Sequence, residues 1–184
     1  GYFWSKDYYA DSLTRRQGIR SNEMDMIYIR GDKPAGWDQV GQDFYQYNLT
    51  TLAHEYQHLV HFGELVWSGN QTASDVWIDE MMAMAAETMY FKEKLRVNPS
   101  FTHPDMLPGG YLAGRIEYYN QDPNSSIRNG HGLTYWNNSG DVYANYTLSY
   151  LFGQYLSLQA ANGQSIFKAI LDYMIAHGRT DYQA

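Results

Sequence analysis

Two histidines four residues apart, with a glutamate directly after the first, form the part of this sequence best suited to chemistry. They are His54 and His58, and the glutamate is Glu55. In an α-helix, positions four apart differ by about 40° around the axis and roughly 6 Å along it, so both imidazoles can reach one metal ion. Glu55 points about 100° away from His54 and so lies beside that ion. The spacing predicts a metal site on one face of a helix.

The arrangement His-Glu-x-x-His is typical of zinc metalloproteases, in which the glutamate acts as a general base. A catalytic zinc ion takes three protein ligands and keeps a fourth position open for water. His54 and His58 supply two ligands. A third ligand must therefore come from elsewhere in the chain, and a carboxylate is a suitable donor.

Glu80 is the candidate for this third ligand. A second helix is predicted over residues 75–95, and one stripe of it, with spacing i, i+3, i+4 and i+7, consists of Glu80, Ala83, Met84, Glu87 and Phe91. An unpaired carboxylate on such a packed face is costly, and metal coordination is one way to remove the cost. Glu87 has the same difficulty, and we expect it to accept a hydrogen bond from a ligand histidine. The methionines at 81, 82, 84 and 89 are expected to fill the core.

Three further histidines are not expected to be ligands. His61 lies about 20° from His54 in projection, but a longer histidine motif would need a glycine at 61 and a histidine at 64. We therefore expect His61 to be buried or to contact a ligand. His103 and His131 fall in a segment rich in proline, glycine and asparagine, and both are expected at the surface.

The same residues resemble a known family. Thr51-Leu-Ala-His-Glu-Tyr-Gln-His58 and Trp77-Ile-Asp-Glu80, followed by Glu87, resemble the gluzincin zinc metallopeptidases. They are most similar to the hyicolysin-type neutral metalloproteases and more distantly similar to thermolysin and the leucotriene hydrolase/aminopeptidase group. The chain departs from the family pattern at positions 79 and 81, where it has Asp-Glu-Met in place of Asn-Glu-Gly.

The resemblance implies a zinc-dependent endopeptidase. One zinc ion would be held by His54, His58 and Glu80, and Glu55 would be the general base that acts on water attacking a peptide bond. Protein or peptide substrates and an extracellular or cell-surface location follow from the same resemblance.

A tyrosine is the expected donor to the oxyanion of the reaction. The segment 146–152 resembles the family segment that brings a tyrosine to the metal, so Tyr146 is the first candidate, and His131 is the second. Tyr146 could equally be a core tyrosine. Both interpretations stay open from the sequence.

Two other functions remain as alternatives. A gluzincin aminopeptidase would use an acidic residue on a cleft-lining strand to bind the substrate amine, and Glu23 or Asp25 could serve, although the Gly-x-Met-Glu-Asn pattern of those enzymes is absent from the segment 22–29. A non-catalytic surface domain stabilised by zinc is the other alternative, and the presence of Glu55 argues against it.

Length and charge set further limits. A chain of 184 residues with 44% hydrophobic residues fits one domain, here residues 1–184 as a metallopeptidase catalytic domain, and we expect the natural protein to extend beyond it. A net charge of −7 argues against nucleic acid and anionic membranes as partners. No apolar run reaches the roughly 18 residues of a transmembrane helix. The oligomeric state is not determined.

The expected fold is α+β, with a small N-terminal antiparallel or mixed sheet packed on a mainly helical body and the motif helix at its centre, as in zincins. A short helix is predicted in 4–14, a strand in 23–30 and a turn in 31–36. The strand either lines the cleft and pairs with extended substrate or is an ordinary sheet strand. Asn48 or Thr50 is expected to cap the motif helix and Gly63 to end it. Further helices are predicted at 111–120, 142–161 and 165–176.

Overall fold

The computed structural model describes residues 1–32, 44–69, 71–101 and 111–180. His103 and most of the turn expected over 31–36 lie outside these residues. In chain order the elements are β1 (Tyr2–Phe3), η1 (Ser5–Tyr8), α1 (Asp11–Thr14), η2 (Arg15–Gln17), β2 (Ile27–Tyr28), α2 (Phe44–His61), η4 (Phe62–Ser68), α3 (Val76–Val97), α4 (Tyr111–Gln121), α5 (Val142–Gln159) and α6 (Ser165–His177). Of the three η elements, η1 and η2 are 3₁₀-helical and η4 is π-helical.

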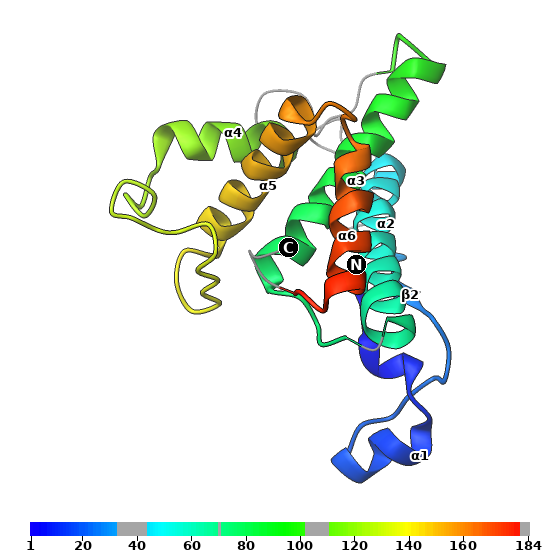
Figure 1. Cartoon of the computed structure of the whole chain (residues 1–184). Coiled ribbons are helices and arrows are strands. Elements are labelled where there is room, and N and C mark those ends of the chain that lie inside the picture. Colours follow the sequence, from blue (N-terminus) through cyan, green and yellow to red (C-terminus); the bar gives the residue numbers. More distant parts are fainter. Residues whose placement is uncertain (33–43, 70, 102–110, 181–184) are drawn as a thin grey trace.

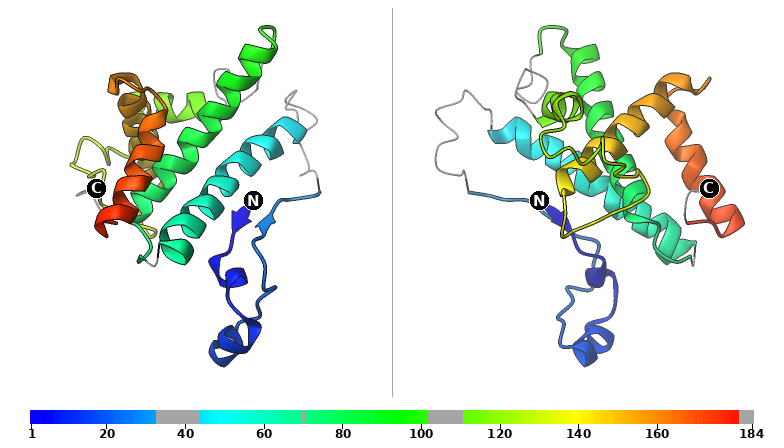
Figure 2. Two further views of the ribbon diagram at one scale, coloured as in Figure 1. Left: turned by 45° about the vertical axis from the view of Figure 1, so that its right-hand side comes forward. Right: turned by 90° about the vertical axis from the view of Figure 1, so that its left-hand side faces the viewer.

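Helix α3 is the centre of the molecule. It runs alongside α2 in the opposite direction, as Figure 2 shows, and its other side packs against α5. Helix α4 packs on α5, and α6 contacts both α5 and η4 (Figure 1). Because neighbours cover α3 on several sides, it contributes more buried residues than any other described helix. Polar side chains on α3 must therefore find partners inside the protein.

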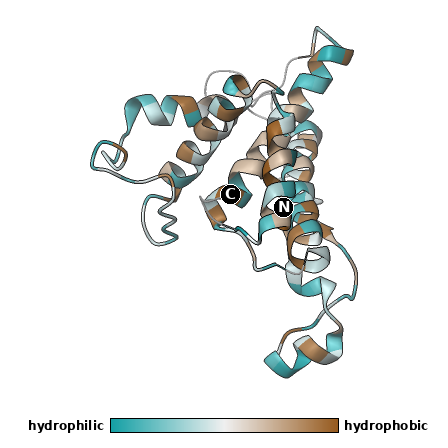
Figure 3. Cartoon of the chain, viewed as in Figure 1, coloured by the Kyte–Doolittle hydropathy of each residue, from teal (hydrophilic) through white to brown (hydrophobic). Residues whose placement is uncertain are grey.

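Two hydrophobic clusters hold these helices together. The larger one joins α3, η4 and α6 and consists of Leu65, Trp77, Ile78, Met81, Met82, Ala85, Phe167, Leu171 and Met174. The smaller one joins α3, α4 and α5 and consists of Met84, Phe91, Leu112 and Tyr150. Figure 3 shows the hydrophobic residues concentrated on the packed helices, whereas α1 is mainly hydrophilic. The expectation that the methionines of α3 fill the core is confirmed.

The N-terminal segment forms one antiparallel strand pair. Tyr2 lies opposite Tyr28 and Phe3 opposite Ile27. The strand expected over 23–30 is therefore much shorter, because Glu23 has φ of 54°, a left-handed conformation that strands do not tolerate. One edge of β2 is occupied by β1, and both strands contact α2, whereas the part with α1 extends away from the helical body (Figure 2).

A buried aspartate organises the same segment. Asp7 is fully buried and accepts hydrogen bonds from the backbone N–H and the side-chain amide of Asn22. The hydroxyl of Tyr28 donates to its second oxygen at 2.6 Å. These bonds connect η1 to the chain before β2 and satisfy a carboxylate that burial would otherwise penalise. The short helix expected in 4–14 is divided into η1 and α1.

The ends of the motif helix differ from the prediction. Helix α2 begins at Phe44, so Asn48 and Thr50 are not caps. Thr50 instead donates its hydroxyl to the carbonyl of Gln46, which satisfies a polar group inside a helix. Gly63 does not end the helix either, because the chain continues as η4 to Ser68. A side chain at position 63 would meet the hydroxyl of Tyr8, so Gly63 allows this close contact rather than a turn.

The other predicted helices are confirmed with small changes at their ends. The helices expected over 75–95, 111–120, 142–161 and 165–176 correspond to α3, α4, α5 and α6. Gly178 ends α6 in the left-handed conformation, with φ of 63°. A mainly helical body with a two-stranded antiparallel sheet is consistent with the α+β class. Within the described ranges, no helix combines the length and hydrophobicity needed to cross a membrane.

Candidate metal centre

Helices α2 and α3 bring two histidines and a glutamate together. The Nε2 atoms of His54 and His58 lie 3.1 Å apart. The Oε2 atom of Glu80 lies 3.3 Å from His54 Nε2 and 3.8 Å from His58 Nε2. Among the described residues, these three form the one group with spacing suited to a metal ion. These are the three residues that the sequence analysis named as candidate ligands.

The three atoms have the spacing that a tetrahedral ion requires. Nitrogen and oxygen ligands about 2.0–2.2 Å from a zinc ion are about 3.3–3.6 Å from one another at tetrahedral angles. The observed separations of 3.1, 3.3 and 3.8 Å bracket this range. Glu80 Oε2 is moreover buried and faces the two imidazole nitrogens. A buried carboxylate oxygen of this kind needs a cation, and the two imidazoles beside it supply the remaining donors.

His54 is held from behind by a second carboxylate. Its Nδ1–H donates to Glu87 Oε1 at 2.6 Å, so Nε2 is the atom that faces Glu80 and His58. The side chain of Glu87 is only 3% exposed. Burial lowers the pKa of His54, but Glu80 and Glu87 outweigh it and raise that pKa to about 10. Without a metal this site therefore binds a proton, and a metal ion would have to displace it.

His58 is supported by a different residue. Its Nδ1 lies 3.0 Å from Asp79 Oδ1, and the Nδ1 of His61 lies at the same distance from that oxygen. Burial lowers the pKa of His58, but Asp79 and Glu80 raise it above its usual value. Burial raises the pKa of Asp79, whereas the two histidines hold it well below its usual range. His61 is 3% exposed, so the expectation that it is buried is confirmed, and its contact is with Asp79.

A small cavity opens beside His54. It has a volume of about 190 Å³, and its lining residues are Gly1, Tyr47, Thr50, Thr51, His54, Glu55, Glu87 and Tyr146. Glu55 is buried at the wall of this cavity, next to the group of His54, His58 and Glu80. The hydroxyl of Tyr146 donates to Glu80 Oε1 over a long 3.4 Å, and its ring contacts Trp136 edge-on. A carboxylate and a phenol thus share one cavity with His54.

Other residues singled out from the sequence lie elsewhere. His131 is paired through Nε2 with the amide oxygen of Asn145 and does not line the cavity. Glu23 accepts a hydrogen bond from the backbone N–H of Asp11, and neither Glu23 nor Asp25 lines the cavity. Tyr146, and not His131, therefore lies beside the group of His54, His58 and Glu80.

Two residues that contact the candidate ligands or their supporting carboxylate were not identified from the sequence. Asp79 contacts both His58 and His61, although it was noted only as a departure from the family pattern. Arg115 is fully buried and donates to Glu87 Oε2 at 3.1 Å. Its signal was weak, namely a charged residue three positions after Leu112 in a helix whose apolar face must pack.

The fold and the site define a mainly helical protein with a partly buried His-His-Glu group that could hold a metal ion. Neutral metalloprotease ShpI from Staphylococcus hyicus is 40% identical to the chain over 172 residues, which is 93% of the chain and 33% of that protein. No family model matches the chain. The chain is therefore related to a neutral metalloprotease, and it spans about a third of the length of that relative.

Proposed function

We propose that the chain is the catalytic domain of a zinc-dependent endopeptidase of the gluzincin type, with a zincin-like arrangement of its central helices. The observation that carries the proposal is the triangle of His54, His58 and Glu80, in which a buried carboxylate oxygen faces two imidazole nitrogens. Two nitrogen donors, one carboxylate and tetrahedral spacing are the ligand set of a catalytic zinc site. The name of the relative adds support for proteolysis.

Zinc bound to these residues would polarise a peptide carbonyl and make water easier to deprotonate. Glu55 lines the cavity beside His54 and is the group placed to accept the proton from the attacking water. The same carboxyl would return this proton to the leaving amine. Tyr146 presents a hydroxyl at the same cavity and would donate a hydrogen bond to the oxyanion.

Endopeptidase activity is favoured over aminopeptidase activity by the position of the acidic residues. Glu23 contacts α1, and neither it nor Asp25 lines the cavity that holds Glu55. The structure thus offers no support for an amine-binding role of either residue. Protein or peptide substrates and an extracellular or cell-surface location are part of the same proposal.

The test is hydrolysis of casein and of an internally quenched peptide whose N-terminus is blocked. We expect the purified protein to cleave both, to lose activity in a chelator and to regain it with zinc. Cleavage of the blocked peptide excludes a strict aminopeptidase. Protein that binds zinc but cleaves neither substrate would instead support the non-catalytic alternative.

Glu55→Gln separates metal binding from catalysis. The amide keeps the shape of the side chain and cannot accept a proton, so we expect zinc to remain bound while turnover falls by about 10²- to 10⁴-fold. The matched control is Glu64→Gln, in η4, because Glu64 lines a different cavity from Glu55. Near wild-type turnover of Glu55→Gln would refute the assignment of the base.

A further inference from the structure

Arg115 in α4 is a fully buried cation close to the candidate metal ligands. A buried guanidinium group is costly unless a carboxylate compensates its charge. Arg115 Nη1 donates to Glu87 Oε2 at 3.1 Å, and the guanidinium carbon lies 5.1 Å from the centre of the Tyr150 ring. The carboxylate and the aromatic face, from α3 and α5, together stabilise the cation at this position.

The two oxygens of Glu87 have different partners. Oε1 accepts the Nδ1–H of His54 at 2.6 Å, and Oε2 accepts the hydrogen bond from Arg115. Because each oxygen is occupied, the carboxylate cannot rotate without breaking a charged hydrogen bond inside the protein. The oxygens of a carboxylate accept hydrogen bonds and do not donate them. His54 is thereby required to donate from Nδ1.

We propose that Arg115 is a positioning residue of the metal site: through Glu87 it fixes the His54 imidazole with Nε2 directed at Glu80 and His58. The inference builds on the proposed function, because the ring orientation matters for the metal that the site would hold. A residue outside the ligand set that orients a ligand histidine preserves the shape of the site before the metal enters. Arg115 performs this role from α4, which contributes no ligand itself.

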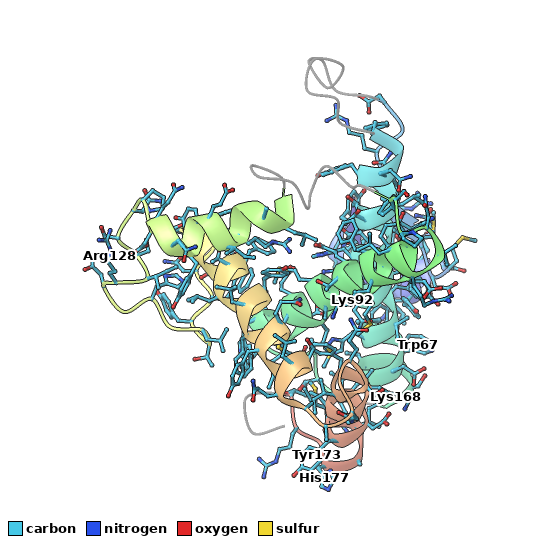
Figure 4. The ribbon with its side chains drawn as sticks, turned by 90° about the horizontal axis from the view of Figure 1, so that it is seen from above. Trp67, Lys92, Arg128, Lys168, Tyr173 and His177 are labelled. Atoms are coloured by element: carbon cyan, nitrogen blue, oxygen red, sulfur yellow. The ribbon has the colours of Figure 1, made fainter. Side chains whose placement is uncertain are left out.

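Zinc affinity of the metal-free protein is the first test. We expect Arg115→Met to weaken zinc binding by about 10- to 100-fold, as measured by competition with a chelating dye. Arg115→Lys should recover part of the loss, since an ammonium group restores the charge but not the planar donor pair. The control is Arg128→Met, because Arg128 also pairs with a buried aspartate, Asp122, and lies at the far end of the molecule (Figure 4). Unchanged or tighter zinc binding by Arg115→Met would overturn the proposal.

A double-mutant cycle separates positioning from general packing. If Arg115 acts through Glu87, the change Arg115→Met should add little once Glu87→Gln is present. If it weakens zinc binding equally in both backgrounds, Arg115 only supports the fold and the proposal is wrong. Thermal unfolding of all four proteins gives a parallel stability cycle, and a folded Arg115→Lys keeps the comparison available if the methionine variant unfolds.

A second readout does not depend on metal. The Nδ1–H of His54 should give a downfield proton resonance with slow solvent exchange in the metal-free wild type, and this resonance should shift or vanish in Arg115→Met. Retention of the resonance unchanged would overturn the positioning role. Failure of the wild type to bind zinc would instead refute the proposed function, and the resonance would still report on Arg115.

Discussion

The two candidate ligand histidines have unlike supports. Behind His54 stands Glu87, whose side chain is 3% exposed and which is paired with the fully buried Arg115. Behind His58 stands Asp79, whose side chain is 35% exposed and which is shared with His61. The first support includes a guanidinium charge in the interior, whereas the side chain of the second support is more exposed.

The difference corresponds to where the cavity lies. The cavity is lined by His54, Glu55, Glu87 and Tyr146, and neither His58 nor Asp79 is part of its wall. The side of the cluster that faces the cavity is therefore the side with the more buried support. Accurate placement of ligands and donors is most valuable where the reacting atoms meet. We infer that the site depends more on the accurate placement of His54 than on that of His58.

Removal of Glu80, the candidate ligand that lies beside both histidines, should have the largest effect. Glu80 lies beside both Nε2 atoms, so Glu80→Ala should reduce zinc affinity by more than the roughly 10- to 100-fold typical of an outer partner. Zinc content after gel filtration measures this loss. Asp79→Ala is the control and should retain its zinc. The reverse result would mean that Asp79 is the ligand.

Tyr146→Phe tests whether the His54 side is where the reaction occurs. A donor that acts on the oxyanion contributes mainly to the transition state, so kcat should fall by about 10²- to 10³-fold with little change in KM. Tyr143→Phe is the matched control on α5, because the ring of Tyr143 contacts Tyr118 instead of the cluster. If kcat of Tyr146→Phe stays at the wild-type value, Tyr146 is a core residue, and His131→Ala is the next variant to measure.

The two supports can be compared directly by neutralising each one. Glu87→Gln should weaken zinc binding by about 10- to 100-fold, and Asp79→Asn should weaken it less. The reason is that the Glu87 side chain is buried, so water cannot take over its contact with His54. The Asp79 side chain is partly exposed. Zinc titration of both variants under one set of conditions decides the order. Equal losses would remove the distinction between the two sides.

The pH dependence of metal-free stability should show the same contrast between the two histidine supports. The pKa of His54 is raised to about 10, so its contribution to the free energy of unfolding is complete below about pH 6.5 and is lost as pH rises toward 10. The pKa of Asp79 is lowered, so its contribution is present above about pH 4 and is lost in acid. The Tm of the metal-free protein should therefore fall both in acid and toward pH 10.

The alkaline loss can be assigned to His54 by a variant. Glu87→Gln removes one of the carboxylates that raise the pKa of His54, so the Tm of the metal-free variant should depend less on pH between 6.5 and 10. An equally steep decrease in Tm in Glu87→Gln would show that another group is responsible.

The sequence by itself determined the local part of the site. Two histidines at i and i+4 must share a helix face, and the stripe of α3 that carries Glu80 and Glu87 follows from the same periodicity. Both relations depend only on backbone geometry within one helix. For this reason the spans of α3, α4, α5 and α6 could also be predicted closely.

Only the tertiary structure decided the partners of these residues. Arg115 meets Glu87 from 28 positions away in the sequence, and Asp79 reaches His58 and His61 across the α2–α3 interface. The close approach of Tyr8 to Gly63 in η4 likewise joins residues far apart in the sequence. Periodicity states which face of a helix is buried, but the residue that covers a given atom depends on how distant helices pack. Periodicity indicated Glu87 as the acceptor for a ligand histidine, whereas the contacts of Asp79 and Arg115 became visible only in the folded chain.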